Sequence, residues 1–369
     1  MKSITQVTGG KQQFFQGFHE VQKFFEEHLS GEHLTFMNML RVIEDVMPAV
    51  YHPKAKTGRP PYDDMAFFRA FLALNYFAIP SVTLLIKTLR SDPNLRQLCG
   101  FKKVPVNSSF SRHLDIFSSL NLLNEILDAL VKKAYRDLPI IHVCRDSTAI
   151  TAREKVVKGT EEKDKKPVKK RGRPPKGSPK VEKEPSNLKK QLSLDAHTIL
   201  HNLNKDCSFG CKKNSQGNVF FWKGYKLHLD VSDIGFPLSA WVSGANVHDS
   251  QCAIPLEKLT SKKVKYFYSV MDSAYDAKWI HAYIKKCRRI PIIDPNRRRD
   301  KNRPSLDPAK QERYKIRTVV ERSYSHLKGR LIPQSLFEKG NPKVSFVLMM
   351  GVIALAALKY LYYFPATSG

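Results

Sequence analysis

The middle of the chain holds a lysine- and proline-rich segment that can form neither a stable helix nor a sheet strand. Residues 155–190 contain 14 Lys or Arg against 5 Asp or Glu, together with five prolines. Proline removes a backbone hydrogen-bond donor, and the excess of like charge opposes compaction. We therefore predict a flexible basic insertion at about residues 152–220, with folded sequence on both sides of it.

Before this insertion, the apolar residues follow the spacing of helices. Residues 65–79 are apolar on all sides, as in a buried helix, and residues 108–135 repeat apolar side chains every three to four positions. Ser108 or Ser109 could cap the second of these helices. We predict an N-terminal all-α domain over residues 1–136. Residues 81–114 suggest a helix-turn-helix that binds DNA through Arg112, although a helical bundle with no DNA role has the same pattern.

After Asp137 the period changes to that of an α/β domain, predicted over residues 137–369. Short β-branched or alternating runs predict strands, and longer periodic runs predict helices. Ile234-Gly235 separates two of the strands and favours a hairpin, which makes Asp230 and Asp233 polar hairpin positions. The strands are expected at residues 139–146, 224–233, 236–243, 264–272 and 290–294, and the helices at residues 251–259, 276–288 and 308–330.

Residues 344–358 carry no charge and raise the question of a membrane. A spanning helix needs about 20 consecutive apolar residues, and this run reaches Lys359 before that length. We expect a buried C-terminal helix and no membrane partner. Membrane contact is the alternative.

The composition points to a polyanionic partner. The chain has 62 Lys or Arg and 34 Asp or Glu in 369 residues, a formal charge of +28. Such an excess favours nucleic acid as the partner. The 42% hydrophobic content excludes a wholly disordered basic tail. Six scattered cysteines suit a reducing compartment, and the polar residues 1–11 predict no secretory signal, so a cytoplasmic location is expected.

Two acids are predicted at the ends of neighbouring strands. Asp146 is expected to end the first strand, and Asp272 ends the strand over residues 264–272. Carboxylates at the carboxyl ends of adjacent strands project into one crevice, where they repel each other unless a cation lies between them. Mg²⁺ is favoured because it accepts one or two carboxylates and leaves positions for phosphate oxygens.

Glu321 is the candidate for a third acid. On a helix, Tyr314, Arg317, Glu321 and Lys328 are separated by three, four and seven residues, so that they share one face. An acid among cations could hold a metal while the guanidinium grips a phosphate. A solvated, salt-bridged helix face is the simpler alternative for this helix taken alone.

These positions resemble the signature of bacterial insertion-sequence DDE transposases. The spacing Y-x2-R-x3-E-x6-K matches that signature at all four positions, and residues 272–275 (DSAY) resemble the family's second-acid motif. Further similar segments are residues 224–228 (GYKLH), 245–249 (ANVHD), 58–62 (GRPPY) and 107–112 (NSSFSR). The resemblance spans roughly residues 35–360 and fails in the lysine-rich insertion.

The resemblance implies an RNase H-like mixed sheet flanked by helices, with Asp146, Asp272 and Glu321 as catalytic, metal-binding residues. The implied cofactor is Mg²⁺, with Mn²⁺ able to substitute. Arg317 is implied to contact DNA phosphate, and Tyr314 and Lys328 to contact the backbone of the transposon end. The family often has an extra domain between the second acid and the glutamate. Only 49 residues separate those positions here, so a hairpin-stabilising role for such a domain is in doubt.

The implied function is transposition. A metal-dependent cleavage at the ends of an insertion sequence would free a 3′-OH strand, which is then transferred to target DNA. The implied partners are double-stranded DNA, as terminal inverted repeats and as target, and a second copy of the chain in a homodimer. The protein would be nucleoid-associated when bound to DNA. An RNase H-like nuclease without strand transfer and a domesticated, non-catalytic DNA-binding protein are the alternatives.

Several residues outside this set have open roles. Arg171 and Arg173 lie in an RGRP segment similar to a minor-groove hook. Nonspecific phosphate neutralisation and a solvated linker are the alternatives. The basic run at residues 297–301 is a loop that could contact phosphate. His197, His201, Cys207 and Cys211 could bind zinc, although ordinary polar or packed side chains are the simpler reading. His228 is expected to be a packed core side chain, with a phosphate contact beside the metal crevice as the alternative. His248 and Asp249 are expected to be structural or helix-capping side chains.

Overall fold

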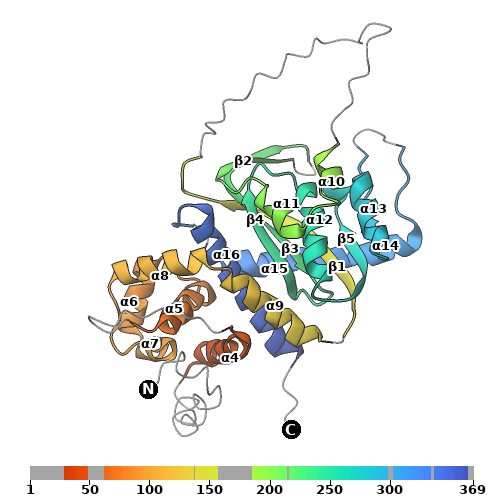
Figure 1. Cartoon of the computed structure of the whole chain (residues 1–369). Helices are drawn as coiled ribbons and strands as arrows, with labels where there is room; N and C mark the ends of the chain where they lie inside the picture. The colour runs from red at the N-terminus through yellow and green to blue at the C-terminus, as the bar shows by residue number, and fades with distance from the viewer. Residues whose placement is uncertain are drawn as a thin grey trace.

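The computed structural model is a mixed α/β protein in which a helical lobe adjoins a six-stranded sheet (Figure 1). It describes residues 29–48, 62–136, 138–156, 185–213, 216–297, 302–333 and 336–364. The predicted N-terminal helical region is present, and the sheet begins directly after it. Most of the buried apolar side chains of the two parts belong to one continuous core.

The N-terminal lobe consists of short helices with side-chain caps. Ser30, Asp63, Ser81 and Asp92 each accept a hydrogen bond from the first turn of the helix that follows. The helix that follows Val106 has no side-chain cap, so the expected cap at Ser108 or Ser109 was wrong. The described helices of this lobe are α4 (Gly31–Val46), α5 (Asp64–Tyr76), α6 (Val82–Ser91), α7 (Pro93–Cys99), α8 (Asn107–Ser119) and α9 (Leu122–Tyr135).

The sheet is mixed and open. Its strands are β1 (Ile140–Thr151), β2 (Ser208–Lys213), β3 (Val219–Val231), β4 (Pro237–Gly244), β5 (Tyr266–Met271) and β6 (Ile290–Ile293). They lie in the order β2-β3-β1-β5-β6, and β4 also pairs with β3. The β1–β3, β2–β3 and β3–β4 pairs are antiparallel, whereas β1–β5 and β5–β6 are parallel. This arrangement is consistent with the expected RNase H-like core.

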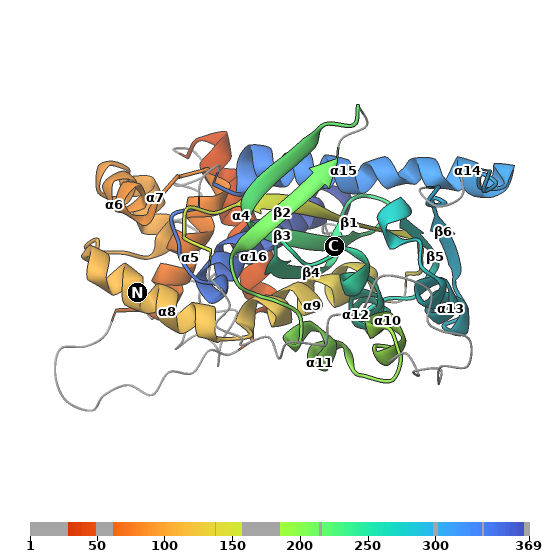
Figure 2. The same ribbon diagram turned by 90° about the horizontal axis from the view of Figure 1, so that it is seen from above.

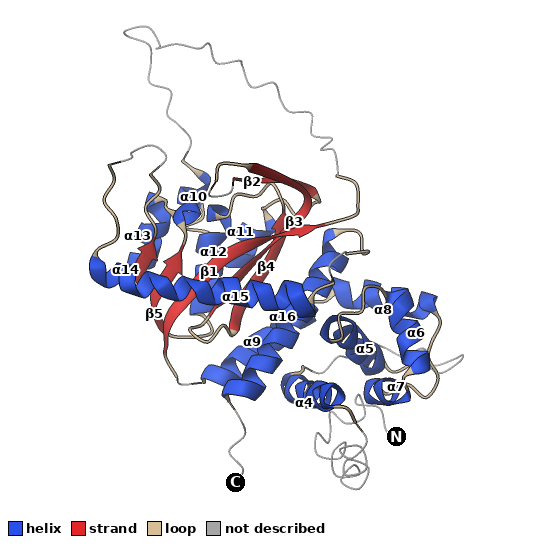
Figure 3. Ribbon diagram, turned by 180° about the vertical axis from the view of Figure 1, so that it is seen from behind, coloured by secondary structure: helices blue, strands red, loops and turns tan. Residues whose placement is uncertain are grey.

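Helices cover both faces of the sheet. One face carries α10 (Asn187–Lys190), α11 (Ala196–His201), α12 (Ser250–Ser261) and α13 (Lys278–Lys286) (Figure 1). The other face is crossed by a nearly continuous helical path, which Figure 3 shows from behind. That path comprises α14 (Pro308–Tyr314), the 3-10 turn η2 (Lys315–Arg317), α15 (Thr318–His326) and the π-turn η3 (Leu327–Leu331).

The C-terminal helix α16 (Asn341–Tyr363) joins the two parts of the molecule. It contacts α4, α5, α8 and α9 as well as β4. By length and composition it is the one helix among the described residues that could cross a membrane, and 72% of its apolar window is buried inside the protein. The expected buried C-terminal helix is therefore confirmed by its packing.

The structure differs from the sequence prediction in three places. Residues 185–213, predicted as part of the insertion, form α10, α11 and β2. Residues 157–184 lie outside the described residues. β1 does not end at Asp146, because antiparallel pairing with β3 extends it to Thr151. The single helix predicted over residues 308–330 changes its winding at η2 and η3.

Gly351 shows how closely α16 is packed. A Cβ atom at this position would lie 2.6 Å from the carbonyl oxygen of Leu331. The amide of Asn75 on α5 donates to that same carbonyl at 2.7 Å and to the carbonyl of Val347 at 2.9 Å. Three elements thus meet around one glycine, and the backbone of η3 approaches α16 closely because no side chain intervenes.

We expect Gly351→Ala to destabilise the protein by about 1–3 kcal/mol, because the added methyl forces backbone apart in a packed core. Helix propensity alone predicts the opposite sign, a gain of up to about 1 kcal/mol. Gly329→Ala is the matched control, since nothing lies within 4 Å of a Cβ added there. Urea unfolding of both variants measures the difference, and a stabilised Gly351→Ala would contradict this packing.

Candidate active site

The register of the parallel β1–β5 pair brings Asp146 and Asp272 together. Cys144 on β1 lies opposite Val270 on β5, where the pairing ends. Each acid follows two residues later along its strand direction, so both side chains emerge at the same edge and on the same face of the sheet. Asp272 directly follows β5 and accepts a hydrogen bond from the backbone N–H of Ala274 at 2.9 Å.

The guanidinium of Arg317 lies among three carboxylates. One terminal nitrogen is 3.0 Å from an oxygen of Asp146 and 3.9 Å from an oxygen of Asp272. The other terminal nitrogen is 2.5 Å from an oxygen of Glu321, one helical turn along the path. The structure thus gathers the three acids predicted from sequence around a single cation, with the Glu321 side chain 54% exposed.

Burial makes these carboxylates costly to ionise. It raises the pKa of Asp146 to about 6, the nearby charge of Asp272 adds to the rise, and Arg317 opposes it. Burial also raises the pKa of Asp272, and the charge of Arg317 opposes this rise. Tyr314 is half-buried, and burial together with the charges of Asp294, Asp272 and Asp146 raises its pKa to about 12. It remains a neutral hydroxyl near the acids.

Tyr324 fixes the helix that carries Glu321 against the sheet. Its hydroxyl lies 2.6 Å from the carbonyl oxygen of Asp146 and 3.1 Å from that of Leu227. The side chain is buried, and burial raises its pKa well above the ordinary value, so it stays a hydrogen-bond donor. Tyr324 could not be predicted as a site residue, because the sequence of a helix does not show which backbone carbonyls a tyrosine on it reaches.

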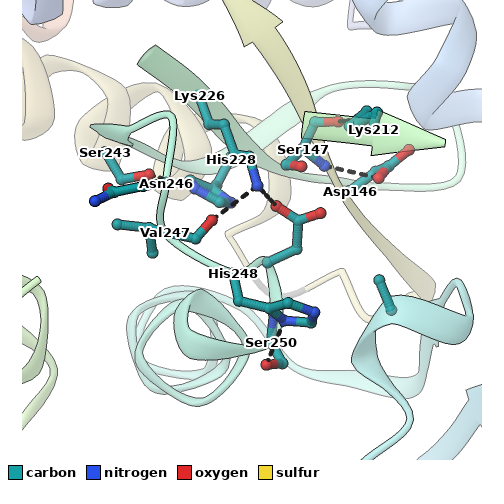
Figure 4. Close-up of polar contacts among 12 residues, drawn as sticks. Asp146, Ser147, Lys212, Lys226, His228, Ser243, Asn246, Val247, His248 and Ser250 are labelled. Carbon is teal, nitrogen blue, oxygen red and sulfur yellow. Dashed lines mark hydrogen bonds and ion pairs between the residues drawn. The ribbon is translucent and has the colours of Figure 1, made fainter. Parts of the chain in front are cut away.

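A cluster of lysines lies beside the acids. The amine of Lys212 on β2 donates to the carbonyl of Ser147 at 3.3 Å, and Figure 4 shows it next to Asp146. Its charge lowers the pKa of Asp146, after the larger effects of burial and Arg317. The pKa of Lys328 is lowered by burial and, to a smaller extent, by the charge of Lys212. Lys212 was not predicted as a site residue, because it falls within the predicted insertion. The strand-turn-strand pattern of residues 208–223 was the available signal.

A group of hydrogen-bonded polar side chains, which includes His228 and Asp249, lies near Ser147 and Asp146 (Figure 4). The buried amine of Lys226 donates to the carbonyl of Val247 at 2.8 Å and to Asp249 at 2.9 Å (Figure 4). Burial alone would raise the pKa of Asp249, but the charge of Lys226 opposes it and the pKa is lowered overall. His228 is fully buried, contacts the hydroxyl of Ser243 at 2.8 Å, and has its pKa lowered to about 4 by burial. It is a neutral core side chain.

The opposite face of β1 holds a sealed ionic network. Arg145 is fully buried and donates to both oxygens of Asp230 at 2.7 Å. A further bond of 3.1 Å reaches Glu257, which Arg289 also contacts at 3.2 Å. Asp230, predicted as a polar position of the hairpin, does lie on β3 and is fully buried in this network. Its alternating position on β3 directs it at Arg145, its neighbour one strand away.

The acids fit a divalent cation. Their ligand atoms are hard carboxylate oxygens, which Mg²⁺ and Mn²⁺ prefer, and the side chains of Asp146 and Asp272 are partly buried. Among the described residues, no group of three or more His, Cys, Asp or Glu side chains already forms a closed metal site. Arg317 instead lies between the acids, so a metal would have to replace the guanidinium.

The remaining predicted residues lie outside this constellation. Arg112 is exposed on α8 and donates to the backbone of Ser108, and Lys328 is exposed in η3. Arg171 and Arg173 lie outside the described residues. His197 and His201 are exposed on α11, whereas Cys207 is buried. They form no metal-holding group in the described part of the chain.

Two family models match the chain. Residues 20–115 match a model described as a transposase domain (DUF772), and residues 186–355 match one described as a transposase DDE domain. The second match begins where the described structure resumes at α10 and ends within α16. No curated protein and no solved structure matches the chain.

Asp146→Asn is expected to stabilise the protein at neutral pH when chelator removes divalent ions. The folded-state pKa of about 6 exceeds the ordinary 3.8, so the unfolded state ionises first and stability falls as the pH rises between these values. Above pH 7 the asparagine variant should gain up to about 3 kcal/mol, and near pH 4 the gain should vanish.

Denaturant unfolding across this pH range measures the effect. Asp195→Asn provides a control of opposite sign, because hydrogen bonds from Thr198 lower the pKa of Asp195 to about 2. Its ionised form stabilises the fold, so the substitution should bring no gain at neutral pH. Equal stability of Asp146→Asn and the parent at pH 8 would contradict the burial cost.

Proposed function

The chain is an insertion-sequence DDE transposase, and we propose that it cleaves DNA at the ends of its element and joins the freed 3′ strand to target DNA. The gathering of Asp146, Asp272 and Glu321 around one guanidinium carries this proposal. Three acids far apart in the chain meet where the parallel strands end, beside a rim of lysines. We further propose that it acts in the cytoplasm on the nucleoid and as a homodimer, because the reaction joins two ends.

The acids are proposed to hold the cofactor, and the surrounding cations to hold the DNA. Asp146, Asp272 and Glu321 would bind Mg²⁺, or Mn²⁺ in its place. When bound, the divalent ions supply Lewis acidity at the attacking and leaving oxygens of an in-line phosphoryl transfer. The guanidinium of Arg317, no longer needed as a counter-ion, can then grip a phosphate through two parallel hydrogen bonds.

The positions of the other cations agree with this division of roles. Burial lowers the pKa of Lys328, and the nearby charge of Lys212 lowers it further. Like charges brought together at an open rim are relieved when a polyanion binds between them. Tyr314 remains neutral, so its hydroxyl can donate a hydrogen bond to an oxygen of the DNA backbone.

Both chemical steps use the same side chains. In the first, water attacks the phosphodiester at the end of the element, and the bond to the 3′ oxygen breaks. In the second, that 3′-hydroxyl attacks a target phosphodiester, and a new phosphodiester replaces the broken one. Neither step needs a covalent bond to the protein. The electrostatic work of Arg317 is the same in each, since charge develops on the phosphate oxygens both times.

We expect Asp146→Asn, Asp272→Asn and Glu321→Gln each to reduce cleavage by at least about 100-fold, because each removes a charge that holds the cofactor. DNA binding should persist, since none of the three acids attracts phosphate. Cleavage of DNA carrying an element end in Mg²⁺ is measured beside a gel-shift assay. Asp195→Asn, an exposed acid at a helix cap, serves as the control and should retain activity. Full activity in one of the three variants would remove that residue from the proposed triad.

Joined products separate transposition from simple nuclease activity. With a supercoiled target plasmid, the proposed function yields element ends covalently attached to the plasmid. A nuclease with the same core would give cut ends and no joined product, and a domesticated DNA-binding protein would give no Mg²⁺-dependent cut at all. Arg317→Lys should impair both steps, because an ammonium cannot replace the two-pronged contact of a guanidinium.

A further inference from the structure

A two-stranded ribbon carries exposed aromatic side chains next to the acids. β2 pairs with the first part of β3, with Lys212 opposite Phe220 and Gly210 opposite Trp222. Figure 2 shows β2 running out past the rest of the sheet. Phe209, Phe220 and Phe221 are 64%, 62% and 68% exposed. Exposed phenylalanines grouped in this way cost solvation free energy and indicate a binding surface.

The two faces of the ribbon differ. Side chains alternate along each strand, so Phe209 and Phe221 lie on one face, and Lys212 and Phe220 lie on the other. The amine of Lys212 reaches the carbonyl of Ser147, the residue after Asp146. The Lys212 side chain on the face of Phe220 therefore lies next to the backbone of the residue that follows Asp146 (Figure 4).

Phe220 is the outer member of an aromatic stack. Its ring lies nearly parallel to the buried ring of Trp222, with 6.5 Å between centroids and 13° between planes. Trp222 is held from beneath, because Gly210 leaves room for it and its N–H donates to the carbonyl of Tyr225 at 3.2 Å. The inner ring is fixed, and the outer ring exposes its other side to solvent.

We infer that Phe220 is a stacking platform for an unpaired base of the DNA end, with Lys212 contacting the adjacent phosphate. The inference rests on the proposed function, which places a DNA end at the acids. An aromatic ring over a rigid neighbour, beside a lysine, matches the way in which proteins hold single strands irrespective of sequence. The ribbon adds a positioning surface for nucleotides next to the phosphate that reacts.

Charge favours nucleic acid over a protein partner on this ribbon. Residues 208–223 include three lysines and no Asp or Glu, and Lys212 is the one of them that lies on the face of Phe220. The charge of Lys212 also acts on Asp146, Asp272 and Lys328, so the face is continuous with the proposed active site.

Binding of tailed DNA to an inactive protein tests the inference. The full-length Asp146→Asn protein is titrated with a duplex that ends in a short single-stranded tail containing 2-aminopurine, and with the same duplex made blunt. Phe220→Ala should weaken binding of the tailed duplex about 5- to 150-fold, the loss of one base stack, and should leave blunt binding unchanged. It should also relieve the quenching of 2-aminopurine, whereas Phe220→Trp should preserve it.

Phe221→Ala is the matched control, since it removes an equally exposed phenylalanine from the opposite face of the same strand. Equal losses for Phe220→Ala and Phe221→Ala, or no loss for either, would overturn the inference. So would an altered sedimentation of Phe220→Ala with unchanged DNA binding, which would assign the face to a protein contact. If the protein with Asp146 intact binds the tailed duplex through Phe220 but cleaves no element end, the proposed function is refuted and the inference about Phe220 is not.

Discussion

Repulsion between two desolvated carboxylates governs this site. The parallel register of β1 and β5 fixes Asp146 and Asp272 at one edge of the sheet, and burial raises the pKa of both. A cation must therefore accompany them, and Arg317 provides it in this structure. The helical path that carries Arg317 and Glu321 is in turn held to the sheet by Tyr324. The placement of that path thus follows from both a charge requirement and a hydrogen-bond requirement.

The rest of the fold keeps that edge rigid. α16 packs against the N-terminal helices and the sheet together, so the two parts share one core. The close approach of Leu331 to Gly351 anchors the end of η3, only a few residues after Lys328. Small shifts in this packing would move the cations relative to the acids, and in-line phosphoryl transfer depends on such positioning.

Much of this arrangement could be predicted from the sequence, and the failures have physical causes. The change from a helical to a strand period located the sheet, and the spacing of Tyr314, Arg317 and Glu321 located the helical path. β2 was missed because its neighbouring charge and proline obscured a short strand that gains its stability from pairing with β3. Arg145 and Asp230 could not be recognised as partners, since their pairing depends on register between strands 85 residues apart. Lys212 was lost together with β2.

Adjacent residues of β1 show two solutions to the same electrostatic problem. Arg145 points to one face, where Asp230 and Glu257 neutralise it with no exposure to water. Such a network is closed, because each member has its hydrogen-bond partners and removing one leaves a buried charge. Asp146 points to the other face, where a single guanidinium serves three acids and Glu321 stays open to solvent. In the first arrangement the buried side chains stay paired with one another. The second can exchange its cation, and an exchangeable cation is what a site needs if it must take up a metal and release an arginine to DNA.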